Sequence, residues 1–468
     1  MRICLYAYTT SAYFFRALVD ACKEAGDDVE WSVIFPQGNF RHLFRGALPA
    51  ERMLYLYRDF DTRFAACGKD CVERALGSVE DLIAALMKDK DGYRHLDKEE
   101  QLRHAATMAE IYAEFLDRVR PDVILFPDLE VVDGFVLMNL CRARGIGILY
   151  FVEMRLLGRS FFATDSYETL PPHFGAYDDS DREPARTAIG HFRARERFEA
   201  GARYPAAAPP RPSLFRRVVV SAWIKRRYER RHRSDITFRV RITRNFMGLA
   251  GKLRRKRFEL TAKRYFDPVE AVPANYLFYA LHYTPESSVN GLEPYYVDQL
   301  RAIDALLLNM PPGYRLVVKE HPAMLGLRPH AFYRALRHRP GLVLLSPSVD
   351  SRMLMEGAAI VATVTGTVAL EAWLLGRPCL MFGRSFFAHL CRRVPALHDL
   401  GNALTELLSA HPAMSETEKE QEIAKFINIG ADFVIGDPWA SPGMMAAQNI
   451  AAARTYLWHH LSRLKAVT

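Results

Sequence analysis

Residues 359–383 read AIVATVTGTVALEAWLLGRPCLMFG, and their pattern decides the fold class. An apolar run of strand length leads into a hydroxyl-rich turn around Gly366. A helical pattern follows, and a second apolar run begins after Pro378. Strands that are apolar throughout and separated by a helix are typical of parallel sheets covered on both faces. The stretch therefore predicts one unit of a doubly wound α/β sheet.

The same alternation extends in both directions along the 468 residues, a length too great for one compact core. Strand patterns such as YLFYALH and YRLVV recur with helical patterns over residues 271–440, and RICLYAY and DVILF do so over residues 1–180. We therefore expect two doubly wound domains, with a linker and a basic helical insert at residues 181–270. Residues 441–468 form an amphipathic pattern that predicts a final helix, which by analogy packs back on the first domain.

Positive charge is concentrated in one segment of the chain. The net charge is +9, but residues 211–265 alone hold 19 Lys and Arg against 3 Asp and Glu. With Trp223 and Phe246 as apolar anchors, this segment is suited to an anionic membrane surface. Nucleic-acid binding and a solvated helical face are the alternatives. No helix-turn-helix, zinc-finger or RNP pattern accompanies it, so we expect membrane contact and no nucleic-acid partner.

Cysteine usage and the absence of targeting patterns suggest a cytoplasmic protein. The seven cysteines are scattered, and only Cys67 and Cys71 lie close together, which predicts free thiols in a reducing compartment. The N-terminus does not resemble a signal peptide, and no apolar run reaches the ~18 residues of a membrane-spanning helix. No HExxH motif occurs, and we identify no Asp-x-Asp pair as a metal-binding loop. We therefore expect no metal and no cofactor.

Polar residues follow two of the predicted strands of the second domain. KEHP, at residues 319–322, follows one strand, and TVTGT, at residues 363–367, precedes the helix that carries Glu371. In open α/β sheets, ligands bind beyond the carboxyl ends of the strands. Lys and His donors, hydroxyl groups, a glycine and a helix N-terminus together favour a phosphate. A Thr N-cap with a packing glycine and a common His-Pro turn are the structural alternatives.

These motifs carry a resemblance to a known family. LHYTPESSV (281–289), VKEHP (318–322) and the run VATVTGTVALEAWLLGRPCLMFG resemble the bacterial capsule polysaccharide synthesis and export family. Its known members include retaining β-Kdo transferases of GT-B fold, and the HP element is also similar to that of bacterial sialyltransferases. The resemblance is densest over residues 275–389. It implies a GT-B-like protein, with two Rossmann-type domains facing a cleft, and a CMP-sugar donor, with Kdo or a related 2-keto acid favoured.

The resemblance also implies which residues contact the donor. In those families the HP element contacts the CMP part, the hydroxyl-rich loop contacts the phosphate, and a later Glu corresponds to Glu371. With the neighbouring polar residues, the candidate donor-binding residues are Lys319, His321, Pro322, Ser346, Thr365, Gly366, Thr367 and Glu371.

Catalysis of glycosyl transfer requires an acid, because the reaction passes through an oxocarbenium-like state. The family's Kdo transferases usually carry an acidic pair followed by Gly near a strand end of the first domain, whereas this chain has Glu153, Met154 and Arg155 there. Our first catalytic candidate is Glu153. The others are Asp165, Asp128 and His282, for which helix capping or an ordinary buried histidine are the structural alternatives.

Three functions remain open from the sequence. The first is a metal-independent glycosyltransferase, cytoplasmic and peripheral on the inner membrane, that moves a sugar from a CMP-sugar to a surface polysaccharide or glycolipid. The second is a phosphotransferase of the CDP-glycerol type, whose sites share an HP element and a hydroxyl-rich loop. The third is a membrane-bound scaffold that has the fold without the chemistry.

Overall fold

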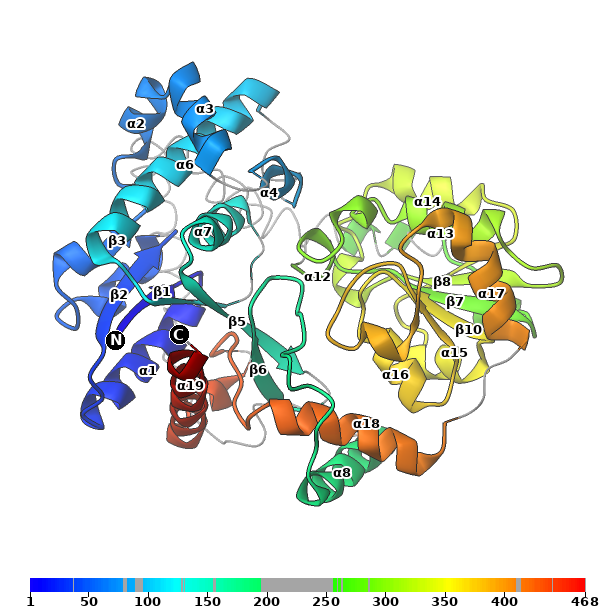
Figure 1. The fold of residues 1–468 in the computed structure, drawn as a ribbon. Coiled ribbons are helices and arrows are strands. Elements are labelled where there is room, and N and C mark those ends of the chain that lie inside the picture. The colour runs from blue at the N-terminus through cyan, green and yellow to red at the C-terminus, as the bar shows by residue number, and fades with distance from the viewer. Residues whose placement is uncertain are drawn as a thin grey trace. The chain divides into compact units, whose positions relative to one another are not determined.

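The structure is a computed structural model of the chain, and it divides into two compact units. One unit consists of Met1–Val240 with Glu420–Thr468, and the other of Arg241–Lys419 (Figure 1). The structure describes residues 1–36, 38–78, 82–88, 96–127, 129, 131–154, 157–194, 256–258, 260–261, 264–284, 287–409, 414–439 and 441–467. Most of the basic insert, the segment predicted to bind membranes, therefore lies outside the described residues.

The first unit contains a six-stranded sheet in the order β3-β2-β1-β4-β5-β6. All neighbouring strands are parallel except β5 and β6, which are antiparallel. Counted along the chain this is the 3-2-1-4-5-6 order of a Rossmann fold. The strands are β1 (Arg2–Tyr6), β2 (Glu30–Phe35), β3 (Met53–Tyr55), β4 (Val123–Phe126), β5 (Gly147–Met154) and β6 (Arg159–Ala163).

Helices of the first unit bury apolar faces against this sheet. On α1, Phe14, Phe15, Leu18 and Val19 are fully or almost fully buried, because they recur at helical spacing. The start of α6 is defined by a capping box, in which the Asp97 side chain accepts the Glu100 N–H. The helices are α1 (Ser11–Glu24), α2 (Phe60–Ala66), α3 (Lys69–Ser78), α4 (Leu82–Lys88), α6 (Lys98–Val119), α7 (Val132–Ala143), α8 (Arg182–Arg193), α18 (Glu416–Ile429), which begins in the second unit, and α19 (Ala447–Val467).

The final helix, α19, packs against α1, the position that the sequence analysis considered for it (Figure 1). Arg454 donates two hydrogen bonds of 2.6 Å to the carboxylate of Asp27, which also accepts one from the indole of Trp458 at 2.7 Å. The hydrogen bonds from Arg454 and Trp458 lower the pKa of Asp27 despite its burial.

The boundary between the two units lies after Lys419. Residues 420–440 therefore belong to the first unit, whereas the sequence analysis expected them in the second domain.

The second unit contains another six-stranded sheet, in the order β12-β11-β10-β7-β8-β9. Every neighbouring pair is parallel. Read from β9, this is again the 3-2-1-4-5-6 order, so the prediction of two doubly wound Rossmann-type domains is confirmed. The strands are β7 (Tyr276–Ala280), β8 (Arg315–Lys319), β9 (Leu342–Leu345), β10 (Ile360–Thr363), β11 (Cys379–Met381) and β12 (Arg392–Arg393).

The helices of the second unit are short, and they cover a core of aliphatic and aromatic side chains from the strands. Leu277, Val318, Leu344 and Ala362 are fully buried and come from four different strands, as continuous apolar strands require. The helices are α12 (Ser287–Asn290), α13 (Leu300–Leu308), α14 (His330–Arg337), α15 (Ser351–Gly357), α16 (Val368–Leu374) and α17 (Leu400–Ser409).

Two of the cysteines differ from the expectation of free thiols. Cys67, which ends α2, and Cys71, in the first turn of α3, form a disulfide with their Cα atoms 5.4 Å apart. That expectation is wrong for this pair, because the short connection between the two helices brings the side chains together. The other five cysteines are free.

Within the described residues, no helix combines the length and the apolar character needed to cross a membrane. Among the same residues, no group of three or more His, Cys, Asp or Glu side chains is arranged to hold a metal ion. The expectation that the chemistry needs no metal stays a prediction.

Candidate functional site

Neighbouring strands β7 and β10 mark the place where the strand order of the second sheet reverses. Ligands of doubly wound sheets bind outside the carboxyl ends of the strands at such a switch point. Here His282 lies just beyond the end of β7, and residues 363–367 follow from the last residue of β10. The HP turn, residues 320–324, follows β8 beside β7. The topology therefore brings the two motifs found in the sequence to the same edge of one sheet.

His282 joins the two sides of the switch point. Its side chain is buried, and its Nε2 lies 2.9 Å from the hydroxyl of Thr363. The same nitrogen accepts the N–H of Val364 at 3.2 Å. Because a backbone N–H can only donate, Nε2 carries no proton, and the ring hydrogen is on Nδ1. Burial, together with the nearby charges of Arg328 and His321, lowers the pKa of His282 to about 3, so the ring is neutral at physiological pH.

Gly366 is required by this arrangement. A Cβ atom added at residue 366 would lie 2.9 Å from the Thr363 hydroxyl oxygen and 3.0 Å from Cε1 of His282. The N–H of Gly366 donates to the Thr363 hydroxyl oxygen at 3.1 Å, so the turn closes on itself and on the histidine. The packing-glycine explanation of the sequence analysis thus describes Gly366 well. It does not exclude ligand binding, because a turn without a side chain also allows close approach of a phosphate.

The threonines of this turn have different surroundings. Thr365 is buried, and its methyl group packs where Gly383 has no Cβ. Thr367 is half-buried at the start of α16, and its hydroxyl donates to the Glu371 carboxylate at 3.5 Å. Burial raises the pKa of Glu371, which the hydrogen bond from Thr367 partly offsets. Thr367 is therefore the more accessible of the two hydroxyl groups that the sequence analysis singled out.

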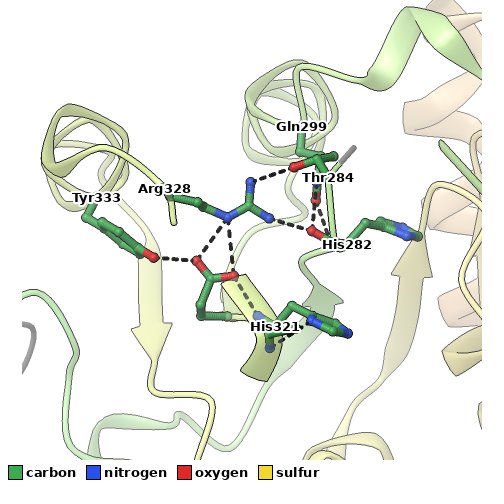
Figure 2. A network of polar contacts seen from close by, with 8 residues as sticks. His282, Thr284, Gln299, His321, Arg328 and Tyr333 are labelled. Atoms are coloured by element: carbon green, nitrogen blue, oxygen red, sulfur yellow. Dashed lines mark hydrogen bonds and ion pairs between the residues drawn. The ribbon is translucent and has the colours of Figure 1, made fainter. Parts of the chain in front are cut away.

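The HP turn is ordered around His321. Its ring Nδ1 accepts the N–H of Ala323 at 3.2 Å and caps the short 3₁₀ helix Pro322–Met324. In the neutral ring the hydrogen is therefore on Nε2, which points away from that cap. The backbone N–H of His321 donates to Glu320 at 2.6 Å. Figure 2 shows the rings of His282 and His321 extending toward the same side of the network that links them.

Lys319 and Ser346 lie one or two strands farther from the switch point. The ammonium group of Lys319 is buried and donates to the hydroxyl of Ser351 at 2.8 Å. Burial lowers the pKa of Lys319, while the carboxylates of Asp350 and Glu320 oppose this shift. Ser346, after β9, lies 3.0 Å from the hydroxyl of Ser348. These residues form a second group of donors on the same sheet edge, without a hydrogen bond to His282.

A buried network behind the HP turn escaped the sequence analysis. Glu320 and Arg328 form an ion pair of 3.0 Å with side-chain exposures of 0% and 7%. Glu320 also accepts the hydroxyl of Tyr333 at 2.8 Å. Nothing in the spacing of Glu320 and Arg328 distinguishes them from surface residues in turns. The one signal in the sequence for Glu320 is its position directly before the His-Pro dipeptide of the KEHP motif.

The comparison with family models bears directly on these turns. Residues 297–390 match the family of capsule polysaccharide biosynthesis proteins. The matched segment contains both turns, the Glu320–Arg328 pair and α16, and it begins after His282. The resemblance stated from the sequence is confirmed over these residues.

Solved structures with similar folds were also found, at low identity. The β-Kdo 2,7 transferase of Thermosulfurimonas dismutans KpsC is 11% identical, with 92% of this chain and 93% of that chain covered and a TM-score of 0.40. The β-Kdo 2,4 transferase of the same protein is 13% identical, with 65% and 79% covered and a TM-score of 0.35. The UDP-GlcNAc 2-epimerase of Methanocaldococcus jannaschii is 13% identical, with 92% and 100% covered and a TM-score of 0.25. A comparison with curated proteins gave no match.

The capsule-family match does not include the first unit. The three catalytic candidates of that unit, Glu153, Asp165 and Asp128, therefore lie outside the match. Glu153 is half-buried near the end of β5, opposite Ser160 of β6. Asp165 accepts hydrogen bonds from the N–H groups of Tyr167 and Thr169 and from the Thr169 hydroxyl, so it closes its own loop. Asp128 lies outside the described residues. Of the two that the structure describes, Glu153 combines partial exposure with a position close to the carboxyl end of β5, a strand parallel to β4.

Proposed function

We propose that this chain is a glycosyltransferase that uses a CMP-activated sugar, with Kdo or a related 2-keto acid favoured, and transfers it to a surface polysaccharide or glycolipid. One observation carries the proposal. Two turns after β8 and β10 converge around His282 at the switch point of a doubly wound sheet. The match of residues 297–390 to capsule biosynthesis proteins supports it, because that segment supplies both turns.

The chemistry of the turns is suited to a phosphate monoester. The Nε2–H of His321 and the Nδ1–H of His282 are donors on the same sheet edge, and the Thr367 hydroxyl would join them by turning its hydrogen from Glu371 to the phosphate. Phosphate oxygens accept such hydrogen bonds, which are charge-assisted because the phosphate is an anion. We assign these donors to the CMP phosphate, which leaves as the sugar is transferred. Because His282 is neutral and its Nε2 is bound within the protein, we assign it to donor binding and not to proton transfer.

A thermal-shift screen of CMP, CDP, UDP, GDP and ADP tests the donor class. A ligand present at 100 times its dissociation constant adds about 2.7 kcal/mol to the free energy of unfolding, which raises the melting temperature by several degrees. We expect the largest shift with CMP. A larger shift with CDP, followed by transfer from CDP-glycerol, would favour the phosphotransferase. The absence of a shift with every nucleotide would contradict the proposed donor site and favour a non-enzymatic scaffold.

We also propose a cytoplasmic location with peripheral binding to the inner membrane, on the charge of residues 211–265. Each Lys or Arg near an anionic surface contributes about 1 kcal/mol. Reversal to Glu of the six basic residues within 225–233 is therefore expected to release the protein from vesicles that contain phosphatidylserine, as measured by flotation. Reversal of the exposed Arg58 and Arg74 serves as the control and should leave binding unchanged. If both variants bound the vesicles equally, the basic segment would be interpreted as a solvated helical face and not as a membrane-binding surface.

A further inference from the structure

The HP turn is attached to the rest of the second unit through a buried carboxylate. Glu320 accepts the backbone N–H of His321, the hydroxyl of Tyr333 and the Nε–H of Arg328. Its side chain is 0% exposed, so all these contacts are made without solvent. Figure 2 shows Arg328, Tyr333 and His321 gathered around this network. Glu320 thus connects the HP turn to Arg328 and to Tyr333 of α14.

The other end of the Arg328 guanidinium contacts the loop after β7, which contains His282. Its Nη2 donates to the carbonyl oxygen of His282 at 2.5 Å, and its Nη1 donates to the hydroxyl of Thr284 at 3.3 Å. Gln299 fixes the same residue, because it accepts the His282 N–H at 2.7 Å and donates to its carbonyl oxygen at 3.2 Å. The backbone of His282 is therefore held by two side chains while its ring holds residues 363–367.

These contacts form one continuous path. It runs from the HP turn through Glu320 and Arg328 to His282, and from the His282 ring to Thr363 and Val364. Arg328 contacts the HP turn through the Glu320 carboxylate and through the carbonyl oxygen of Met324, which accepts its backbone N–H at 3.4 Å. It is linked to residues 363–367 only through His282, so its guanidinium sets the separation between Glu320 and His282.

Stability alone does not account for this arrangement. Taking two opposite charges out of water costs about as much as their attraction returns, and apolar residues of similar volume often replace such pairs without loss. The planar guanidinium offers something that apolar residues lack, which is a fixed angle between donors on its two sides. Arg328 uses Nε toward Glu320 and both Nη atoms toward the backbone and side chain of the β7 loop.

We propose that Arg328 is a positioning residue of the donor site, which holds the HP turn and residues 363–367 in the one arrangement where both can bind the same phosphate. The inference rests on the proposed function, because it presumes that the two turns share a ligand. Arg328 acts through Glu320 and His282 and does not touch the donor.

The test compares three variants of the full chain. Arg328→Met leaves Glu320 buried without its partner and is expected to lower both the melting temperature and the affinity for CMP. Glu320→Gln combined with Arg328→Met removes both charges, while Gln can still accept the N–H of His321. In this double variant we expect the melting temperature to recover toward that of the parent, whereas the dissociation constant for CMP, measured by calorimetry, stays at least tenfold higher. Arg328→Lys, which keeps the charge without the fork, should also bind CMP more weakly.

The control variant breaks another ion pair of the same unit. Arg339 lies two residues after the end of α14, is paired with Asp304, and donates to the carbonyl oxygen of Ala335. Arg339→Met is expected to leave the affinity for CMP unchanged. If the double variant regained both stability and affinity, the pair would have only a structural role and the inference would be overturned.

A second measurement needs no ligand. The amides of Val364 and Gly366 are hydrogen-bonded to His282 and Thr363, so their exchange with deuterated water reports how firmly the turn is held. We expect exchange at least tenfold faster over residues 361–369 in the double variant than in Arg339→Met. Unchanged exchange would overturn the inference. If exchange were faster in the double variant but the parent chain bound no nucleotide, only the proposed function would be contradicted.

Discussion

Glu153→Gln is expected to reduce sugar transfer by about 10²–10⁴-fold while leaving the affinity for CMP unchanged. Gln has the shape of Glu without its charge, so it can neither accept a proton from the acceptor hydroxyl nor stabilise an oxocarbenium-like centre. Glu153 belongs to the first unit, whereas the proposed CMP contacts all belong to the second. For that reason we expect the Glu153→Gln variant to lose transfer activity without losing affinity for CMP.

The measurement is the rate of transfer from CMP-Kdo, with CMP affinity determined in parallel. Glu183→Gln is the matched control, because Glu183 is an exposed residue of the same unit whose partner is Arg186. Full activity of Glu153→Gln would move catalysis to another carboxylate. Asp165→Asn would then be the next variant, with its unfolding measured as well, since Asp165 also closes its own loop.

His321→Ala is expected to weaken CMP binding by about 30-fold, equivalent to about 2 kcal/mol, because it removes a hydrogen bond to a charged group. The ring also caps the 3₁₀ helix after it, so a loss of local order could imitate a loss of contact. His321→Asn resolves this ambiguity, because Asn is a good N-cap but lacks the Nε2–H donor. We expect calorimetry to show weak binding for both variants, with near-parental stability for Asn.

His338→Ala provides the control for this comparison. His338 is exposed at the end of α14, within the matched capsule-family segment, so its removal should not alter affinity. CMP affinity of His321→Asn equal to that of the parent would place the nucleotide elsewhere on the sheet edge. The neighbouring group of Lys319, Ser346 and Ser351 would then be the alternative location.

Much of the fold was accessible from the sequence because buried parallel strands are apolar throughout. β7, β8 and β10 were recognised in this way, and they carry the turns of the candidate site. β3 could not be recognised in this way, since it has only three residues and all of them are half-buried. An apolar run that short has no readable period. The disulfide between Cys67 and Cys71 was missed because its four-residue separation also suits unpaired thiols.

The sequence could predict that residues 363–367 and the HP element share one site, because each follows a strand of the same predicted sheet. Their order along the sheet edge could not, because β7 lies between β8 and β10 only in the folded topology. His282 illustrates the difference. From the sequence it was a catalytic candidate, whereas the structure shows its Nε2 bound to Thr363 and Val364 and its pKa lowered by burial.

By itself the sequence determined that two doubly wound sheets form, and it predicted phosphate-binding chemistry in the second. Both inferences follow from local periodicity and from residues adjacent in the chain. Tertiary structure alone decided that Glu320 and Arg328 are buried partners and that Arg328 reaches the carbonyl oxygen of His282, 46 residues earlier. Charged side chains in turns look alike until folding removes water from some of them. Burial is a property of the whole packed unit, and no short stretch of sequence contains it.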